Sequence, residues 1–301
     1  MKTEHCEFNK TQTIKYLIFT FGVAWAIQIG VALFYYNGMA MVGQLLMAAM
    51  MFVPLLGVLV SGHPLKGMGW RPTLKRNILP FLTAWFSPAV LTALGALMYF
   101  LLFPSHFDLS GQALAESVGT EALRQMEAQG ITYPVYVVIS IVQALTYAPF
   151  LNMFLAVGEE AGWRGFLYPQ IKARFGEKTG RITGGVIWGL WHAPAIGLIG
   201  YEYGFEYFGF PVLGILLFCV ITVALGIICD WLYDRSGCIW LPSLFHGAFN
   251  AAATVPLAVI ASSTGSTRLL GPVPNGLIAG IPLLAFALIL FVKTNKKNVG
   301  L

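Results

Sequence analysis

The feature that most constrains this chain is a series of apolar segments, each long enough to cross a lipid bilayer. A transmembrane helix needs about 20 mainly apolar residues to cross a hydrocarbon core about 30 Å thick. Eight such segments cover Ile14 to Tyr36, Met39 to Ser61, Ile78 to Phe103, Pro134 to Tyr168, Ile182 to Gly200, Phe210 to Leu232, Ile239 to Ser262 and Gly276 to Val292. Hydrophobic residues make up 57% of the chain and charged residues only 10%, which excludes an ordinary water-soluble domain. Because lipid leaves backbone polar groups unpaired and barrel-like alternation is absent, these segments predict helices.

The expected fold is therefore an all-α, polytopic membrane protein with about eight transmembrane helices. No composition change marks a boundary, so we expect residues 1–301 to form a single transmembrane domain. The fourth segment is longer than a bilayer requires, which predicts a tilt, a kink at Pro149 or an extension beyond the membrane. Residues 104–133 form the one long polar connection. Within it, Ala113 to Ala128 has the pattern of an amphipathic helix, either a lid or an interfacial helix.

The charges of the loops predict the orientation of the chain. With the N-terminus in the cytoplasm, almost all basic residues fall on the cytoplasmic side, as the positive-inside rule requires. The outer loops instead carry acidic residues, namely Asp108, Glu116, Glu121, Glu127, Glu202 and Glu206. An even number of spans with both termini in the cytoplasm satisfies this bias. The basic residues are thus explained by topology, and nothing indicates a nucleic-acid partner.

A few polar residues lie inside the predicted spans, where each is a candidate for function because burying it in lipid costs about 2.5 to 3.5 kcal/mol. The fourth span contains Glu159, Glu160 and Arg164, the fifth contains His192, and the seventh contains His246 and Asn250. Counted from the nearest basic loop at 1.5 Å per residue, Glu159, His192 and His246 all lie roughly 15 Å inside the cytoplasmic face. This common depth predicts that they share one cavity.

Helical spacing separates the roles of these residues. Glu160 and Arg164 are four positions apart, which predicts an ion pair that neutralises both groups. Glu159 lies about 100° around the helix, free to face the cavity as a general base with His192 as its partner. His246 and Asn250 are also four apart and project from one face. The aromatic residues closest to this cluster are candidate walls of a substrate cavity, namely Trp163, Trp188 and Trp191.

These residues fall into three ordered motifs that resemble those of the CPBP family, which includes type II CAAX prenyl endopeptidases and bacteriocin-processing (Abi) proteins. The Glu-Glu-x-x-x-Arg motif matches Glu159, Glu160 and Arg164. The aromatic-x-x-x-His motif matches Trp188 and His192, with Trp where Phe is frequent, and His-x-x-x-Asn matches His246 and Asn250. The motif-bearing core covers residues 134–252.

The resemblance implies a fold of eight helices around a catalytic cavity that opens to the cytosol and to lipid. It implies endoproteolysis, with Glu159 and His192 activating water and with His246 and Asn250 stabilising the oxyanion. Glu160 and Arg164 would orient the site. The implied substrate is a lipid-modified or membrane-associated peptide, and prenylated CAAX proteins, bacteriocin leaders and peptide pheromones all fit that description.

Two questions stay open at this point. Glu159, His192 and His246 are also a ligand set that zinc accepts, although we favour a mechanism without a metal or other cofactor. The alternative functions are a non-catalytic membrane protein that confers bacteriocin self-immunity or binds a signalling partner, and a proton-coupled transporter. The complete motif set disfavours the binder, and the lack of paired broken helices disfavours the transporter.

Overall fold

Helices form at every apolar segment in the computed structural model of the protein, which describes residues 7–72, 74–112, 114–115 and 119–294. The main helices are α1 (Lys10–Tyr36), α2 (Ala40–Met50), α3 (Val53–Ser61), α4 (Ile78–Leu102), α6 (Thr120–Ala128), α7 (Tyr133–Leu145), α8 (Ala148–Gly162), α9 (Tyr168–Phe175), α10 (Glu177–Trp191), α11 (Ala193–Ile199), α12 (Val212–Ser236), α13 (Trp240–Ala258) and α14 (Ile281–Thr294). The described residues contain no β-strand, and only Phe107 and Ile260 form an isolated bridge. The prediction of an all-α fold is confirmed.

Length and hydropathy identify the helices that can cross a membrane. Within the described ranges, five stretches qualify: α1, α2 with α3, α4, α10 with α11, and α12. A sixth is added if α7 and the helical stretch from Ala148 to Phe175 are taken as one bent span, and α14 is apolar but shorter. The chain is thus a multi-pass membrane protein, while the count of eight spans stays a prediction.

The fourth predicted segment is not one straight helix. Its two halves, α7 and Ala148–Phe175, meet at an angle of 52°. The break falls at Thr146 and Tyr147, and Pro149 lies in the first turn of α8. A proline has no N–H to donate and its ring clashes with the carbonyl group four residues earlier, so α7 cannot continue through this point, whereas the first turn of a new helix accepts proline. The predicted kink is therefore present, but it lies at the residues that precede Pro149.

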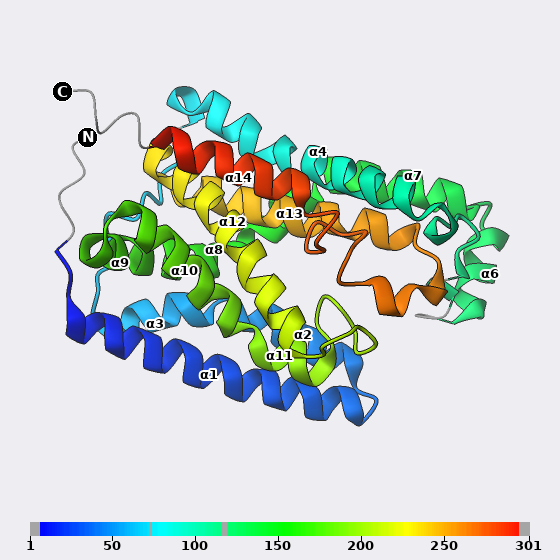
Figure 1. The fold of residues 1–301 in the computed structure, drawn as a ribbon, viewed down its shortest axis with the longest axis horizontal. Coiled ribbons are helices and arrows are strands. Elements are labelled where there is room, and N and C mark those ends of the chain that lie inside the picture. Colours follow the sequence, from blue (N-terminus) through cyan, green and yellow to red (C-terminus); the bar gives the residue numbers. More distant parts are fainter. Residues whose placement is uncertain (1–6, 73, 113, 116–118, 295–301) are drawn as a thin grey trace.

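The helices pack around α12, which has the largest buried share among the candidate spans. Figure 1 shows α12 crossing the bundle between α10 and α14, with α8 and α13 beside it. Helices α8 and α13 make the most extensive contact between any two elements, followed by α10 with α12. These helices carry Glu159, His246 and Asn250, and His192 directly follows α10. Large aliphatic side chains stay exposed on the periphery, as a lipid-facing surface allows: Ile18, Leu33, Leu101, Val138 and Leu288.

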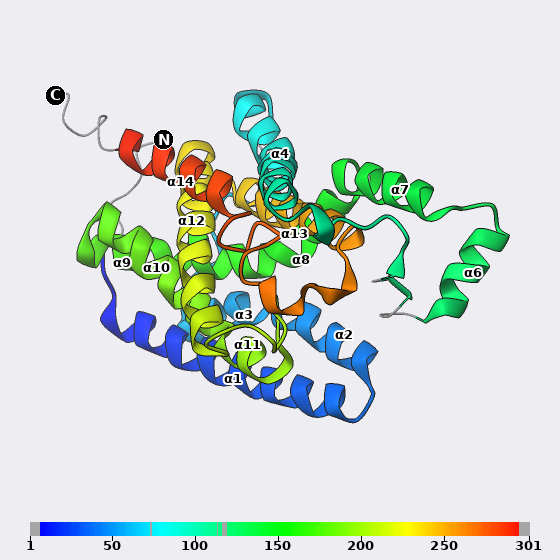
Figure 2. The ribbon, with the colours of Figure 1, turned by 45° about the vertical axis from the view of Figure 1, so that its right-hand side comes forward.

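The long polar connection lies at one end of the bundle. Figure 2 shows α6 projecting beyond the ends of the other helices, with the chain entering α1 and leaving α14 at the opposite end. Of the predicted helix from Ala113 to Ala128, the structure describes a helix over Thr120–Ala128. Residues 113 and 116–118 are outside the described part of the chain. The position of α6 agrees with an extramembrane segment.

Close approach of α8 and α13 depends on Gly247. A Cβ atom at this position would lie 2.5 Å from the backbone nitrogen of Met153 and 2.7 Å from the carbonyl oxygen of Pro149. Both contacts are with backbone, which cannot move aside without separating the helices. We expect Gly247→Ala to lower the free energy of unfolding by about 1–3 kcal/mol, measured by unfolding in detergent. Gly22→Ala in α1 is the matched control, because a Cβ atom there meets nothing within 4 Å. Equal stability of the two variants would contradict this prediction.

Candidate active site

A cavity of about 180 Å³ lies between α2, α8, α10, α12 and α13. Glu159, His192, His246 and Asn250 all line it. Glu159, His192 and His246 are 3%, 7% and 8% exposed, so their polar atoms face the cavity and not bulk solvent. The structure thus brings together the four residues that the common depth and the motif order predicted to meet.

The carboxylate of Glu159 is held by two indole groups. Trp188 Nε1 donates to Glu159 Oε2 at 2.7 Å, and Trp163 Nε1 donates to the same oxygen at 3.2 Å. Trp163 lies one helical turn after Glu159, whereas Trp188 reaches it from α10. Charge-assisted hydrogen bonds of this kind fix the orientation of a carboxylate. Among the described residues, no group donates to Oε1, which leaves this oxygen available to a water molecule.

Glu160 and Arg164 form the expected ion pair, and both side chains are fully buried. Arg164 Nη1 lies 3.1 Å from each carboxylate oxygen of Glu160. The guanidinium group is also sandwiched between two rings, with its Cζ atom 4.7 Å from the centroid of Tyr168 and 4.5 Å from that of Trp188. This pair is behind the cavity wall, since neither residue lines the cavity.

Glu160 has a second partner in His246. The Nδ1 atom of His246 lies 3.0 Å from Glu160 Oε1. Because a carboxylate oxygen accepts hydrogen bonds, the Nδ1 atom of His246 must carry the proton. The Nε2 atom is then free to act in the cavity. A residue of the first motif therefore positions a residue of the third: Glu160 fixes the tautomer and the orientation of His246.

His192 is fixed in a similar way by the backbone. Its Nδ1 atom lies 3.0 Å from the carbonyl oxygen of Trp188, which can only accept. The imidazole stacks on Tyr201 with a centroid separation of 5.8 Å and an interplanar angle of 7°, and Phe218 and Trp191 contact it edge to face. Helix α10 ends at Trp191 and α11 begins at Ala193, so His192 occupies the junction. Its Nε2 atom is likewise left for the cavity.

The three candidate wall tryptophans have different positions. Trp188 lines the cavity, whereas Trp163 and Trp191 are fully buried and do not. Trp163 lies behind Glu159, in a π-helical turn over Trp163–Leu167 that the sequence pattern did not predict. Trp191 packs against His192 and donates to the carbonyl oxygen of Thr20 at 3.1 Å. These two residues hold the site in place, and the expectation that they contact substrate is not supported by their positions.

Sequence reasoning missed two polar residues of the cavity, Glu202 and Asn275. Glu202 was expected in an outer loop, but its carboxylate accepts a hydrogen bond of 2.5 Å from Asn275 Nδ2. Burial raises the pKa of Glu202, and the hydrogen bonds from Asn275 and Tyr201 oppose that shift. The sequence did contain one signal for the position of Glu202, the glycines at 200 and 204. Both have positive φ, and the segment between them turns the chain back toward the cavity.

The proposed zinc ligands do not converge. A zinc site requires donor atoms about 2.0–2.2 Å from one ion and thus only a few ångströms apart. Within the described part of the chain, just one group of three His, Cys, Asp or Glu residues has its donor atoms all within 4.8 Å of one another, and it is Glu177, Asp230 and Asp234. Glu159, His192 and His246 are thus too widely spaced, as arranged here, to hold a zinc ion together.

The convergent acidic group is already occupied by two cations, Lys172 and Arg181, that pair with its three carboxylates. Lys172 Nζ lies 3.0 Å from both Asp230 and Asp234, and Arg181 Nε lies 2.6 Å from Asp230. These contacts join α9, α10 and α12 in one network of ion pairs. The group therefore links these three helices through ion pairs.

Comparisons with known proteins match the segment that carries the motifs. Residues 141–252 match a family model described as "Type II CAAX prenyl endopeptidase Rce1-like". A "CAAX prenyl protease 2" from Methanococcus maripaludis is 33% identical over 103 residues, which is 34% of this chain and 37% of the relative. The match thus spans little more than a third of that relative. The resemblance to the CPBP and CAAX protease family, inferred from three short motifs, is confirmed over this segment.

Proposed function

We propose that this chain, whose residues 141–252 are similar to the type II CAAX prenyl endopeptidases, is an intramembrane endopeptidase. It hydrolyses a peptide bond in a lipid-modified or membrane-associated peptide. The observation that carries the proposal is that Glu159, His192, His246 and Asn250, from three separate motifs, line one cavity. From the positive-inside bias we infer that both chain termini lie in the cytosol.

In this proposal Glu159 is the general base. Its Oε2 atom is occupied by two indole donors, so Oε1 takes a proton from a water molecule in the cavity. The neutral imidazole of His192, with its proton on Nδ1, offers the Nε2 lone pair to the second hydrogen of the same water. The resulting hydroxide attacks the carbonyl carbon of the scissile bond. Proton transfer to a positioned base contributes about 10²–10⁴-fold to such reactions.

His246 and Asn250 are proposed to hold the oxyanion that this attack creates. Asn250 supplies an amide N–H, and its position one turn after His246 in α13 directs both toward one group. Because the Nδ1–H of His246 is bound to Glu160, an oxyanion donor at Nε2 requires the doubly protonated imidazolium. When the C–N bond breaks, the proton held by Glu159 passes to the leaving amine, which restores the carboxylate.

The test is direct cleavage of a reporter. The purified protein is reconstituted in liposomes with a prenylated peptide and, separately, with an unmodified membrane-associated peptide, and the products are identified by mass spectrometry. The proposal requires two new peptide ends from at least one reporter. If no reporter is cleaved while the protein still confers immunity in cells, the non-catalytic alternative replaces it.

Chelation separates the glutamate mechanism from the zinc mechanism. Because Glu159, His192 and His246 do not converge on a common point, we expect cleavage in the presence of a zinc chelator to stay within about twofold of the untreated rate, whereas loss of a catalytic zinc removes several kcal/mol of transition-state stabilisation. Cleavage rates before and after chelation, with the zinc content of the purified protein, provide the measurement. A large loss of activity that added zinc restores would contradict the metal-free mechanism.

A further inference from the structure

Glu202 has three properties that the proposed reaction does not use. It lies in the loop between α11 and α12, where it lines the catalytic cavity and also a larger open pocket of about 500 Å³. It is the one described non-glycine residue with positive φ, at 68°. A left-handed backbone is unfavourable for a residue with a Cβ atom, and such conformations cluster where the surroundings enforce a functional geometry.

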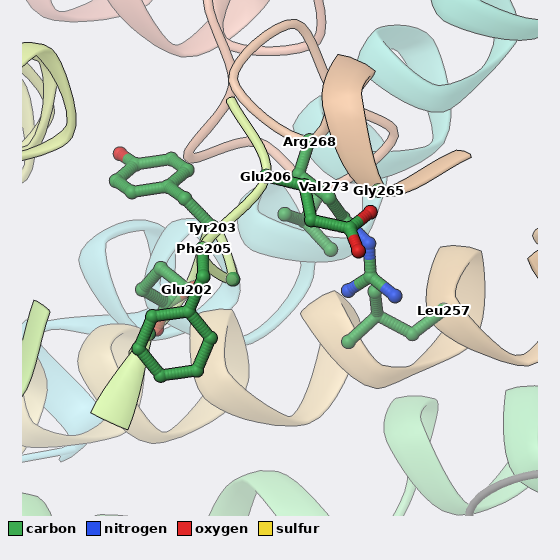
Figure 3. A pocket seen from close by; sticks show the side chains of 10 residues that line it. Glu202, Tyr203, Phe205, Glu206, Leu257, Gly265, Arg268 and Val273 are labelled. Atoms are coloured by element: carbon green, nitrogen blue, oxygen red, sulfur yellow. The ribbon is translucent and has the colours of Figure 1, made fainter. Parts of the chain in front are cut away.

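The carboxylate of Glu202 has no cation to balance it. Among the described residues, no Lys, Arg or His nitrogen lies within 4.0 Å of its oxygens. The nearest basic residue lining the open pocket is Arg268, and Figure 3 shows its guanidinium group on the other side of that pocket from Glu202, toward Leu257. Removing a carboxylate from water is costly when no cation balances its charge, so this half-buried site is suited to a cation that arrives from outside.

Asn275 supplies a second acceptor. It is only 4% exposed, lines the cavity, and donates from Nδ2 to Glu202. Its backbone oxygen accepts from the Tyr203 hydroxyl at 2.9 Å, but its Oδ1 atom has no hydrogen-bond partner. Buried polar atoms are nearly always paired, so an unpaired oxygen beside an unbalanced carboxylate indicates a missing donor. Together the two side chains offer acceptors to one group.

We propose that Glu202 and Asn275 form a subsite of the catalytic cavity that binds the ammonium group of a lysine side chain of the substrate. This rests on the proposed endopeptidase function. Tyr201, the residue before Glu202, stacks on His192, so the subsite adjoins the reacting groups.

The test compares lysine with norleucine, which keeps the aliphatic stem but lacks the ammonium group. Reporter peptides carry one or the other at each of the three positions on either side of the scissile bond. At one position, we expect the wild-type protein to cleave the lysine peptide with a kcat/KM about tenfold or more above that of the norleucine peptide, as for a hydrogen bond to a charged group. In Glu202→Gln this ratio falls to about one, through KM.

Controls separate recognition from positioning. Glu206→Gln changes an acid of the same loop that lines only the open pocket, and it should retain the wild-type ratio. Asn275→Ala removes the amide group beside the Glu202 carboxylate. It should also lower the ratio of kcat/KM for the lysine peptide to that for the norleucine peptide. An equal loss with both peptides in Glu202→Gln would mean that Glu202 only supports His192 through Tyr201, and this would overturn the subsite.

Binding makes the subsite testable apart from cleavage. The affinity of each peptide is measured for the protein carrying Glu159→Gln, with and without Glu202→Gln. If the wild-type protein cleaves no peptide but the lysine preference in binding depends on Glu202, the endopeptidase proposal fails and the subsite stands. If no position favours lysine in either assay, the subsite is wrong whatever the outcome for cleavage.

Discussion

Replacing Glu159 with glutamine is expected to reduce peptide cleavage by about 10²–10⁴-fold, the usual contribution of a positioned general base. Glutamine has the same shape, and its carbonyl oxygen can still accept from Trp163 and Trp188, so the side chain should stay in place. What it loses is the ability to take a proton from water. The expected loss is therefore in kcat, measured with a saturating reporter in liposomes, and His192→Ala and His246→Ala should act in the same direction.

Glu127→Gln in α6 is the matched control, because it makes the same chemical change on an exposed residue far along the chain from the cavity. Its cleavage rate should equal that of the wild type. Thermal unfolding of both variants in detergent checks that a slow variant is folded. Full activity of Glu159→Gln would rule out this residue as the base and with it the mechanism proposed here.

Removing Arg164 should have the largest effect on stability. Arg164→Met keeps an unbranched, though shorter, side chain but leaves Glu160 buried without its cation, and breaking a buried ion pair on one side costs about 3–5 kcal/mol. The loss should exceed that of a surface pair because both side chains are completely inaccessible and the guanidinium group also stacks between Tyr168 and Trp188. Unfolding by SDS in mixed micelles measures the difference in free energy.

Two further variants test this explanation. Arg174→Met removes an exposed arginine from α9 and should change the free energy of unfolding by less than about 0.5 kcal/mol. Glu160→Gln combined with Arg164→Met removes both charges and should recover much of the stability, yet it should not recover activity because His246 loses its carboxylate partner. A wild-type stability of Arg164→Met alone would show that the pair is not needed for folding.

Hydropathy and spacing predicted much of this architecture. The apolar segments became helices because lipid allows a polar backbone few alternatives. The i, i+4 spacing correctly paired Glu160 with Arg164, because that relation is local to one helix. The shared depth of Glu159, His192 and His246 also agreed with one cavity, although depth alone does not show which helices are neighbours.

Hydropathy and residue spacing did not predict the features that depend on tertiary contacts. The bend that Pro149 predicted is present, just before this residue, whereas the π-helical turn after Gly162 has no counterpart in the sequence pattern. Gly200 and Gly204 mark a turn before and after Glu202, but the contact of Glu202 with Asn275, more than 70 positions away in the chain, is not visible in the local sequence. The charge of its loop was therefore a misleading guide to the environment of Glu202, and the topology that loop charge predicts stays a prediction.

Trp188 contacts four functional groups with one side chain and one carbonyl oxygen. Its indole N–H binds Glu159, its ring faces Arg164 and touches His246, and its carbonyl oxygen fixes His192. Phenylalanine, frequent at this motif position in the family, has no N–H to offer the carboxylate. A protein with phenylalanine in place of Trp188 would need another hydrogen-bond donor for the carboxylate of Glu159. We therefore expect evolutionary covariation here, with tryptophan or phenylalanine at this position accompanied by correlated changes around the first glutamate.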